Sequence, residues 1–544
     1  MAFHCVSCNG SMAFDPASQQ MVCEHCGATC APGDFVVGKA DTGVPDVAMA
    51  RFSCQSCGAE LEATDDSMIG LCPFCGGQSL VRDAGGGLSV EGILPFRVGR
   101  EDCQRLYSEF TEGIHYLPDD FGDARHLENF TGIYVPFYQY DVEFGDASIE
   151  GIQTVGMSGG YDEIRYYHIV GRADGPCLHG PTFDASSYLD DELAARIMPY
   201  DMSKLCRYNP AYLAGFYADT PTVGLGHYVA DAQAHAQRVA IHEIAAHLKK
   251  RKRPIVVAEN ASSIDAKVVG RHRVLLPMWF LTWRKGDRVA YAVINGQSGK
   301  VSSDLPVDMR TFWKVGAVIA TTIFILLELL VQPTPLVTSL MSLVAALCMA
   351  GGIRREGEAE YVRQTHLNDK GWWGSGDEDA EVLRESGLQV ERSAEKNRKF
   401  WFRLRVVGLF LLAVSVTVLF TDFISDPRGG FSAFVSSLGW CAVVLQWVLP
   451  PVVGGYAISV VRRIEGWHRE VPSMRDALTS SVVLLVSVII NAGITYASPV
   501  NDEWYYLGDA LCVAGLVYAS VGMMRIYNQS TTRPLPRLFG REEV

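Results

Sequence analysis

Two repeats of one cysteine spacing constrain the fold of this 544-residue chain more than any other feature. Each repeat has a Cys-x2-Cys pair, then fourteen residues, then a second Cys-x2-Cys pair. The eight cysteines are Cys5, Cys8, Cys23 and Cys26 in the first repeat, and Cys54, Cys57, Cys72 and Cys75 in the second. Two such pairs can close a tetrahedral, all-thiolate metal site when the arm between them folds back as a hairpin. We therefore predict two N-terminal zinc ribbons, at 1–30 (ribbon 1) and 51–82 (ribbon 2).

The ligand set indicates which metal to expect and what it does. Zn2+ is the usual ion in a closed four-cysteine site of this spacing, and iron is the competing ion. A site with four protein ligands has no open position for water or substrate. We therefore expect two structural Zn2+ ions, no catalytic residue and no enzymatic activity. Thiolate ligands also require a reducing compartment.

The residues beside the cysteines predict the local backbone and the kind of partner. Glycine follows three of the four Cys-x2-Cys pairs and Asn9 follows the other, and both residue types tolerate the left-handed backbone of a metal-binding turn. The linker at 31–50 and the glycines at 85–87 indicate tethered docking modules. Ribbon 1 contains no Lys or Arg, and the net charge of the chain is −14, so a protein partner is favoured over nucleic acid.

The segment 83–312 is predicted to be a soluble α+β domain with an antiparallel sheet. Aromatic and β-branched runs at 133–137 and 274–283 are typical of strands. Lys285, Gly286 and Asp287 predict a hairpin turn after the second run. The segment 230–250 has the pattern of a helix.

Three motifs in this domain resemble functional signatures. His242 and His247 suggest a zinc protease, but they are five residues apart and a shared helix face needs a spacing of four. The loop 296–300 ends in Gly-Lys, but it lacks the spacing of a phosphate-binding loop. The basic run 249–253 fits contact with anionic lipid or nucleic acid, and it fits equally well as a set of cations that complement the dipole of a helix C-terminus.

The second half of the chain is largely apolar and predicts an all-α, six-helix transmembrane region. Helices 1 and 2 are expected within 313–355, a loop at 356–402, helices 3 to 6 within 403–527, and a tail at 528–544. The six expected spans are 315–331, 335–353, 406–422, 434–460, 479–498 and 504–524.

The flanks of these spans predict their orientation. Lys and Arg are concentrated before the first span, in 354–405, between the fourth and fifth spans, and after the sixth. Basic residues resist translocation, so we expect a multi-pass protein of the cell membrane with both termini in the cytoplasm. Four polar residues of the spans allow an ion-pathway interpretation: Glu328, Asp422, Asn491 and Asp509. A carboxylate near the membrane surface reaches water at little cost, however, and a single Asn commonly makes an interhelical hydrogen bond.

Several separated motifs resemble those of a bacterial family of membrane-anchored zinc-ribbon proteins of the TFIIB type, which are often labelled primosomal replication helicases. The motifs are Ile93-Leu94-Pro95-Phe96, Thr131 to Phe137, Asp184-Ala185-Ser186-Ser187, Asn209 to Phe216 and Asn295 to Val301. The resemblance covers about 54–355. It implies an adaptor role, with SPFH (flotillin-like) or phage-shock-protein-A-like partners in envelope stress. The chain adds a first ribbon and four spans to the shorter relatives.

These observations lead to one main hypothesis and two alternatives. The main hypothesis is a non-enzymatic membrane scaffold that recruits a cytoplasmic or membrane protein partner to the inner face of the bilayer. The first alternative is a transporter or channel regulated by the ribbons. The second is a membrane-tethered nucleic-acid-binding protein.

Overall fold

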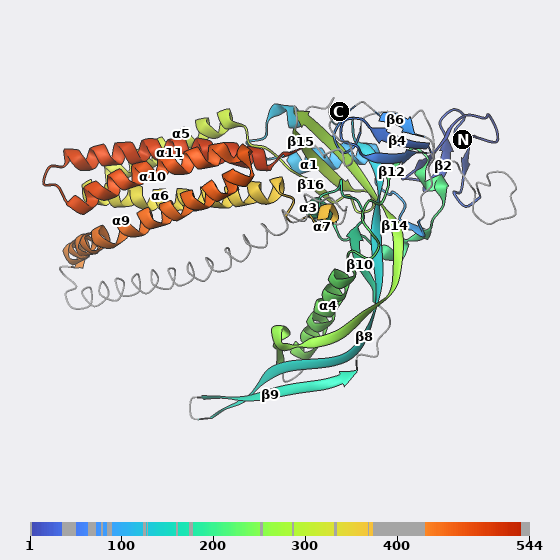
Figure 1. Cartoon of the computed structure of the whole chain (residues 1–544), viewed down its shortest axis with the longest axis horizontal. Coiled ribbons are helices and arrows are strands. Elements are labelled where there is room, and N and C mark those ends of the chain that lie inside the picture. The colour runs from blue at the N-terminus through green and yellow to red at the C-terminus, as the bar shows by residue number, and fades with distance from the viewer. Residues whose placement is uncertain are drawn as a thin grey trace.

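The computed structural model shows a β-rich domain, an arm that projects from it, and a bundle of helices that extends from another side (Figure 1). The described residues are 3–34, 50–63, 72–77, 80–83, 90–122, 127, 129–158, 161–172, 178–250, 254–285, 288–330, 335–367, 369–373 and 430–534. The expected third span at 406–422, the loop after 373 and the last three residues of the basic run 249–253 lie outside them.

Strands dominate the first 310 residues. Ribbon 1 contains β1 (Met12–Asp15), β2 (Gln20–Cys23) and β3 (Thr29–Cys30), and ribbon 2 contains β4 (Ala50–Cys54), β5 (Glu60–Ala63) and β6 (Leu80–Asp83). The other strands are β7 (Gly92–Ile93), β8 (Thr131–Ser158), β9 (Tyr161–Arg172), β10 (Leu178–Asp184), β11 (Cys206–Arg207), β12 (Tyr217–Asp219), β13 (Val256–Val257), β14 (Ser263–Lys285), β15 (Arg288–Asn295), β16 (Val301–Ser303) and β17 (Arg533–Pro534).

The helices fall into two groups. Those of the β-rich domain and the arm are α1 (Arg100–Thr111), α3 (Asp191–Ile197) and α4 (Val229–Lys249), with short 3-10 helices between strands. The later ones are α5 (Met309–Leu330), α6 (Pro335–Gln364), α7 (Lys370–Trp373), α9 (Gly430–Glu470), α10 (Arg475–Ala497) and α11 (Glu503–Ser530).

Fourteen strands form one sheet whose centre is the antiparallel pair β8 and β14. Both strands place apolar side chains in the core, where Val135 lies opposite Leu276. The hairpin expected after 283 is present, because Lys285 of β14 pairs with Arg288 of β15. Two short pairings, β12 with β8 and β7 with β14, are parallel, so the expectation of an antiparallel sheet holds for most of its strand pairs.

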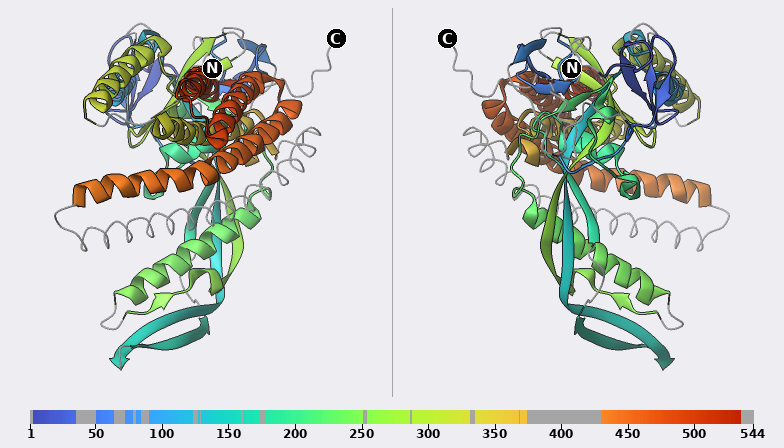
Figure 2. Two further views of the ribbon diagram at one scale, coloured as in Figure 1. Left: turned by 90° about the vertical axis from the view of Figure 1, so that its left-hand side faces the viewer. Right: turned by 90° about the vertical axis from the view of Figure 1, so that its right-hand side faces the viewer.

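The arm is built from the far ends of β8 and β14, together with β9 and α4 (Figure 2). β8 is 28 residues long and continues from the core of the domain into the arm. A small apolar cluster, including Ile149, Ile241 and Ile264, joins α4 to the strands. The arm is therefore a folded extension of the main sheet with a core of its own.

The ribbons are packed against the β-rich domain, which corrects the expectation of tethered docking modules. Strand β5 of ribbon 2 pairs with β12 of the large sheet, so ribbon 2 is continuous with that sheet. Ribbon 1 forms a separate three-stranded sheet, and the amide of Phe14 donates to the carbonyl of Ala214 at 2.9 Å. The expectation failed because these strand pairings and contacts join residues far apart in the sequence.

The predicted six-helix transmembrane region is wrong for the part of the chain that the structure describes. Two helical segments there are long and apolar enough to cross a membrane, Pro472–Ala497 and Glu503–Ser530. The expected span 335–353 is part of α6, which continues as one helix to Gln364 through a charged second half. The predicted six-span, multi-pass localisation in the cell membrane is therefore corrected to two candidate membrane helices.

The helices α10 and α11 pack closely because small residues face each other every seven residues. Gly508, Gly515 and Gly522 of α11 lie against Asn491 and Ile494, Ser487 and Ser480 of α10, respectively. A Cβ atom at Gly515 or Gly522 would overlap the facing serine side chain. Small residues at this spacing allow the close antiparallel approach that is common between helices in membranes.

Candidate metal centres

Ribbon 1 brings its four cysteine sulfurs together. The Sγ atoms of Cys5 and Cys26 are 3.6 Å apart, and those of Cys8 and Cys23 are 3.4 Å apart. All four sulfurs lie within 4.8 Å of one another. Sulfurs at the corners of a tetrahedron around Zn2+ are separated by about 3.8 Å, as follows from a Zn–S bond of about 2.3 Å. The quartet could therefore hold one metal ion.

Ribbon 2 has the same arrangement in a buried environment. The Cys54 and Cys75 sulfurs are 3.6 Å apart, and the Cys57 and Cys72 sulfurs are 3.7 Å apart. All four side chains are buried, whereas Cys8 and Cys26 of ribbon 1 are exposed. The two centres therefore share a ligand geometry and differ in their access to solvent.

Four equivalent turns hold the cysteines. In each turn the residue after the second cysteine donates its amide to the carbonyl of the first cysteine, at 2.8 or 2.9 Å. That residue has a positive φ in every case: Asn9 (59°), Gly27 (72°), Gly58 (77°) and Gly76 (65°). The predicted left-handed residues, including the asparagine, are confirmed.

Backbone amides also favour the thiolate form of two ligands in ribbon 1. The amides of Ser7 and then Cys8 lower the pKa of the Cys5 thiol to about 6. The amide of Cys26 is the main cause that lowers the pKa of Cys23. Thiolates are the metal-binding form of cysteine, so these turns prepare the ligands for a cation.

Side chains of β14 and β15 support the second Cys-x2-Cys turn of ribbon 2. Thr282 donates its hydroxyl to the carbonyl of Pro73 at 2.5 Å, and Tyr291 donates to that of Phe74. Arg284 Nη1 donates to the hydroxyl of Ser56 in the first turn at 2.9 Å. Ribbon 2 is therefore anchored by hydrogen bonds from the large sheet as well as by strand pairing.

Within the part of the chain that the structure describes, the other sequence motifs lie outside the metal-ligand groups. His242 is exposed on α4, and its Nδ1 lies 3.5 Å from a carboxylate oxygen of Glu259. Lys300 donates to the backbone carbonyl of Met198 at 2.7 Å. Among the described residues, two groups have their ligand atoms within 4.8 Å of one another, and both consist of cysteines alone. His25 and Cys30 belong to neither group.

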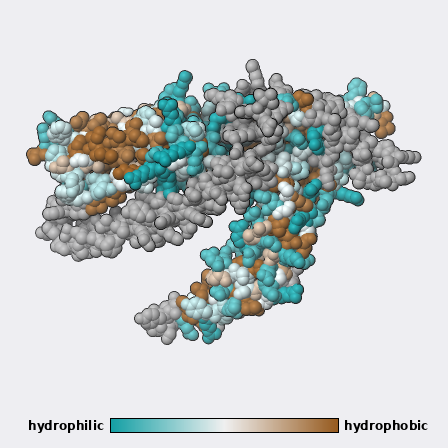
Figure 3. Space-filling view, viewed as in Figure 1, coloured by the Kyte–Doolittle hydropathy of each residue, from teal (hydrophilic) through white to brown (hydrophobic). Residues whose placement is uncertain are grey.

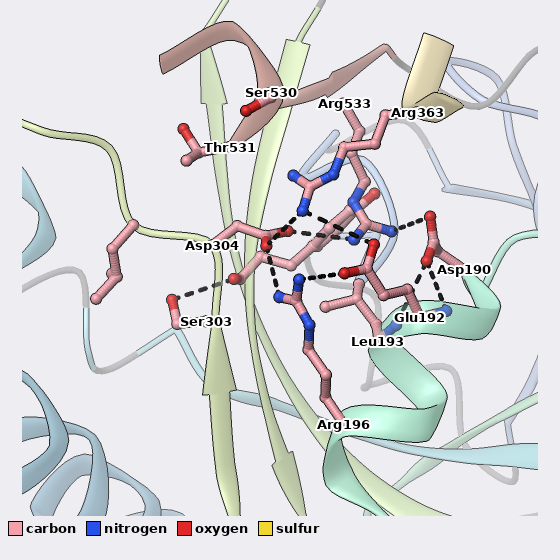
Figure 4. A network of polar contacts seen from close by, with 12 residues as sticks. Asp190, Glu192, Leu193, Arg196, Ser303, Asp304, Arg363, Ser530, Thr531 and Arg533 are labelled. Atoms are coloured by element: carbon pink, nitrogen blue, oxygen red, sulfur yellow. Dashed lines mark hydrogen bonds and ion pairs between the residues drawn. The ribbon is translucent and has the colours of Figure 1, made fainter. Parts of the chain in front are cut away.

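A charged cluster at the base of the bundle was not expected from the sequence (Figure 4). The Arg533 guanidinium follows α11, is buried, and contacts Asp190 at 2.6 Å and Asp304 at 3.3 Å. Asp304 also accepts from Arg196 at 3.0 Å. Arg363, near the end of α6, lies 3.7 Å from Asp304. These contacts join both α6 and α11 to the β-rich domain.

A second polar cluster lies in an open cavity of about 370 Å³ beside β7, β8 and β14. His272 contacts Glu91 through Nδ1 at 2.6 Å and Asp141 through Nε2 at 3.0 Å. The hydrogen bond to Glu91 is the main cause that raises the pKa of His272. His272 is 181 positions from Glu91 and 131 positions from Asp141, and the pairing of β14 with β7 and β8 brings the three residues together.

Comparison with known proteins gives one distant relative. The chain is 23% identical over 320 residues to YdjG, an uncharacterized protein of Bacillus subtilis (strain 168). The match covers 56% of this chain and 90% of that protein. No protein-family model matches the chain, and no solved structure matches it.

Proposed function

We propose that the chain is a non-enzymatic adaptor that holds two structural Zn2+ ions and binds a protein partner beside a lipid bilayer. The observation that carries the proposal is the closed geometry of the two cysteine quartets, which are built into one β-rich domain. A closed four-sulfur site stabilises the fold around it and leaves no coordination position for substrate. The metal would fix the shape of a binding surface.

The distribution of residues on α10 supports contact with lipid. Its buried side includes Ser480, Ser487 and Asn491, whereas the exposed side is apolar. The exposed residues of α10 include Val482, Val483, Val486, Ile489 and Ile490. Hydrophobic residues also gather on the visible face of the bundle (Figure 3). Apolar residues outside and small polar residues inside suit a helix surrounded by hydrocarbon.

The hydrogen bonds of the polar residues within the bundle favour a packing role over an ion pathway. Asn491 accepts from Ser339 at 2.9 Å and donates to Ser342 at 2.7 Å. Asp509 accepts from Thr338 at 2.7 Å and from Ser342 at 2.9 Å. Such contacts join α6, α10 and α11, so these side chains have a structural use that requires no transported ion.

The low positive charge of the ribbons supports a protein partner over nucleic acid, as does the net charge of −14. The resemblance to zinc-ribbon proteins linked to SPFH and phage-shock-protein-A systems supports the same class of partner. We therefore propose that the adaptor's partner is a protein in the membrane or at its surface that takes part in the envelope-stress response.

Metal analysis tests the first half of the proposal. The purified full-length chain should contain about two zinc ions per molecule, by elemental mass spectrometry. Replacing Cys8 and Cys26 by Ser should reduce the zinc content to about one, and Cys206→Ser, outside both quartets, should leave it unchanged. Iron in place of zinc, or retention of both ions by the double variant, would contradict the assignment.

Affinity purification from membranes tests the second half. The Cys8→Ser/Cys26→Ser variant is a better probe than a cysteine variant of ribbon 2. Ribbon 1 has its own sheet, and the variant leaves the buried ribbon 2 intact. We expect it to lose a protein that co-purifies with the unaltered chain and with Cys206→Ser. An unchanged set of co-purifying proteins, from a variant that is still folded, would count against the adaptor function.

A further inference from the structure

Three carboxylates are neighbours where α7 contacts the β-rich domain, and none of them belongs to either cysteine quartet. Asp184 ends β10, Asp191 begins α3, and Asp369 directly precedes α7. A Cβ atom built on Gly371 would lie 3.3 Å from Asp184 Oδ2, 3.3 Å from Asp369 Oδ1 and 3.1 Å from the carbonyl oxygen of Ser186. Three oxygens from two segments, the end of β10 with the loop after it and the residue before α7, therefore surround Gly371.

Two buried polar atoms at this place have no hydrogen-bond partner. Asp184 is 3% exposed and its Oδ2, which faces Gly371, is unsatisfied. Tyr228 is fully buried, stacks on Phe183 at 5.0 Å, and has an unsatisfied hydroxyl. A buried acceptor without a donor is costly, so the arrangement is incomplete as a purely structural contact.

Two nearby cations are engaged by carboxylates outside this group. Lys370 Nζ pairs with Asp231, and Arg533 pairs with Asp190. His366 Nδ1 lies 3.8 Å from Asp369 Oδ2, whereas the Asp369 oxygen closest to Gly371 is Oδ1. Burial, followed by the charge of Asp191, raises the pKa of Asp184 well above its usual value. Burial also raises the pKa of Asp369 to about 6.

We propose that Asp184, Asp191, Asp369 and the Ser186 carbonyl form a site for a hard divalent cation, of which Ca2+ fits best. Ca2+ takes six to eight oxygen ligands in flexible geometry and accepts backbone carbonyls as well as carboxylates, whereas Mg2+ demands a regular octahedron. The unsatisfied Tyr228 hydroxyl would hydrogen-bond a water molecule on the ion. The ion would join α7, and through it the end of α6, to β10 and α3.

Binding requires the ligand side chains to move closer together. Among the described residues, only the cysteine quartets already have all their ligand atoms within 4.8 Å. Asp191 Oδ2 accepts from the amide of Lys370 at 2.6 Å, which leaves its other oxygen to rotate toward Asp184. The site shares no ligand with the zinc centres and does not rest on the adaptor function.

Calorimetric titration of the full-length, zinc-loaded chain with CaCl2 tests the proposal, with MgCl2 as a competing probe. We expect one Ca2+ to bind in the range of about 1 mM or tighter and to raise the thermal unfolding midpoint. Asp184→Asn and Asp369→Asn should each weaken binding by about tenfold or more. Asp265→Asn, an exposed carboxylate on β14 in the arm, is the matched control and should bind normally.

Gly371→Ala is a second variant that keeps every charge and places a methyl group where the oxygens converge. It should lose the Ca2+-dependent shift even if the aspartate variants fold poorly. Absence of both heat and thermal shift with the unaltered chain would overturn the proposal. So would a higher unfolding midpoint for Asp184→Asn without any cation effect, because the carboxylates would then share a proton.

Discussion

The hydroxyl of Tyr291 donates a hydrogen bond to the carbonyl of Phe74, which lies between two cysteines of ribbon 2. The ring of Tyr291 also lies 5.9 Å from the Arg533 guanidinium. Arg533 in turn contacts Asp190 and Asp304 at the base of the bundle. One tyrosine therefore lies between a metal centre and the contacts that join the helices to the β-rich domain.

Replacing Tyr291 by Phe should weaken ribbon 2 because it leaves the buried Phe74 carbonyl without its donor. The expected loss in the free energy of unfolding is about 1–3 kcal/mol. Urea unfolding of the zinc-loaded chain measures it. Tyr166→Phe is the control, since Tyr166 is 84% exposed and should change stability by less than about 0.5 kcal/mol. Equal stability of the two variants would refute this role of Tyr291.

A chelator should remove metal from ribbon 1 before ribbon 2. Cys8 and Cys26 are exposed, whereas all four cysteines of ribbon 2 are buried in the core of the β-rich domain. We therefore expect two kinetic phases of zinc release, followed with a colorimetric zinc indicator. Cys8→Ser should abolish the fast phase and keep the slow one. Release in a single phase from the unaltered chain would show that burial does not control access.

Gly522→Ala should destabilise the packing of α10 against α11, because the added methyl group overlaps Ser480. The expected cost is about 1–3 kcal/mol, measured by thermal or denaturant unfolding in detergent. Ser480→Ala, combined with Gly522→Ala, should restore part of the lost stability, because it removes the hydroxyl that the new methyl group overlaps. Val517→Ala, at an exposed position on α11, is the control. Full stability of Gly522→Ala would argue against this close approach.

Asp219 should make stability depend on pH. It is fully buried, and burial is the main cause that raises its pKa to about 7. A raised carboxyl pKa means that the folded state binds the proton more tightly than the unfolded state does. The contribution of protonated Asp219 to the free energy of unfolding is therefore complete below pH of about 4 and is lost as the pH rises toward 7. Asp219→Asn, which removes the ionisation, should therefore gain about 1–3 kcal/mol relative to the unaltered chain at pH 8, and less at pH 5. An equal gain in stability at pH 5 and pH 8 would show that ionisation of Asp219 is not the cause.

The local parts of the metal centres were predictable from the sequence, and the long-range parts were not. A Cys-x2-Cys turn and its left-handed residue depend on a few neighbouring positions, so Asn9 and Gly58 could be assigned directly. The pairing of ribbon 2 with the large sheet depends on β12, whose Ala218 lies opposite Glu62. No periodicity near the cysteines indicates that partner. The tethered arrangement was therefore the wrong inference from a correct motif.

The helices after residue 309 show a different limit of prediction from sequence. An apolar run reveals that a segment avoids water, but it does not show where the helix ends or what surrounds it. α6 continues beyond the run that ends at 353 and reaches the β-rich domain through Arg363. The charged cluster was also missed, because Arg533 and Asp304 are 229 positions apart. Contacts of this kind appear only when the chain is folded.

The length of β8 determines how far the arm reaches. At about 3.3 Å per residue, a strand of 28 residues extends for roughly 90 Å before twist and irregular pairing shorten it. The same unbroken backbone lies in the core at one end and at the arm's remote tip at the other. A molecule that engages the tip is thus kept at a defined spacing from the sulfur ligands, without a flexible joint in between.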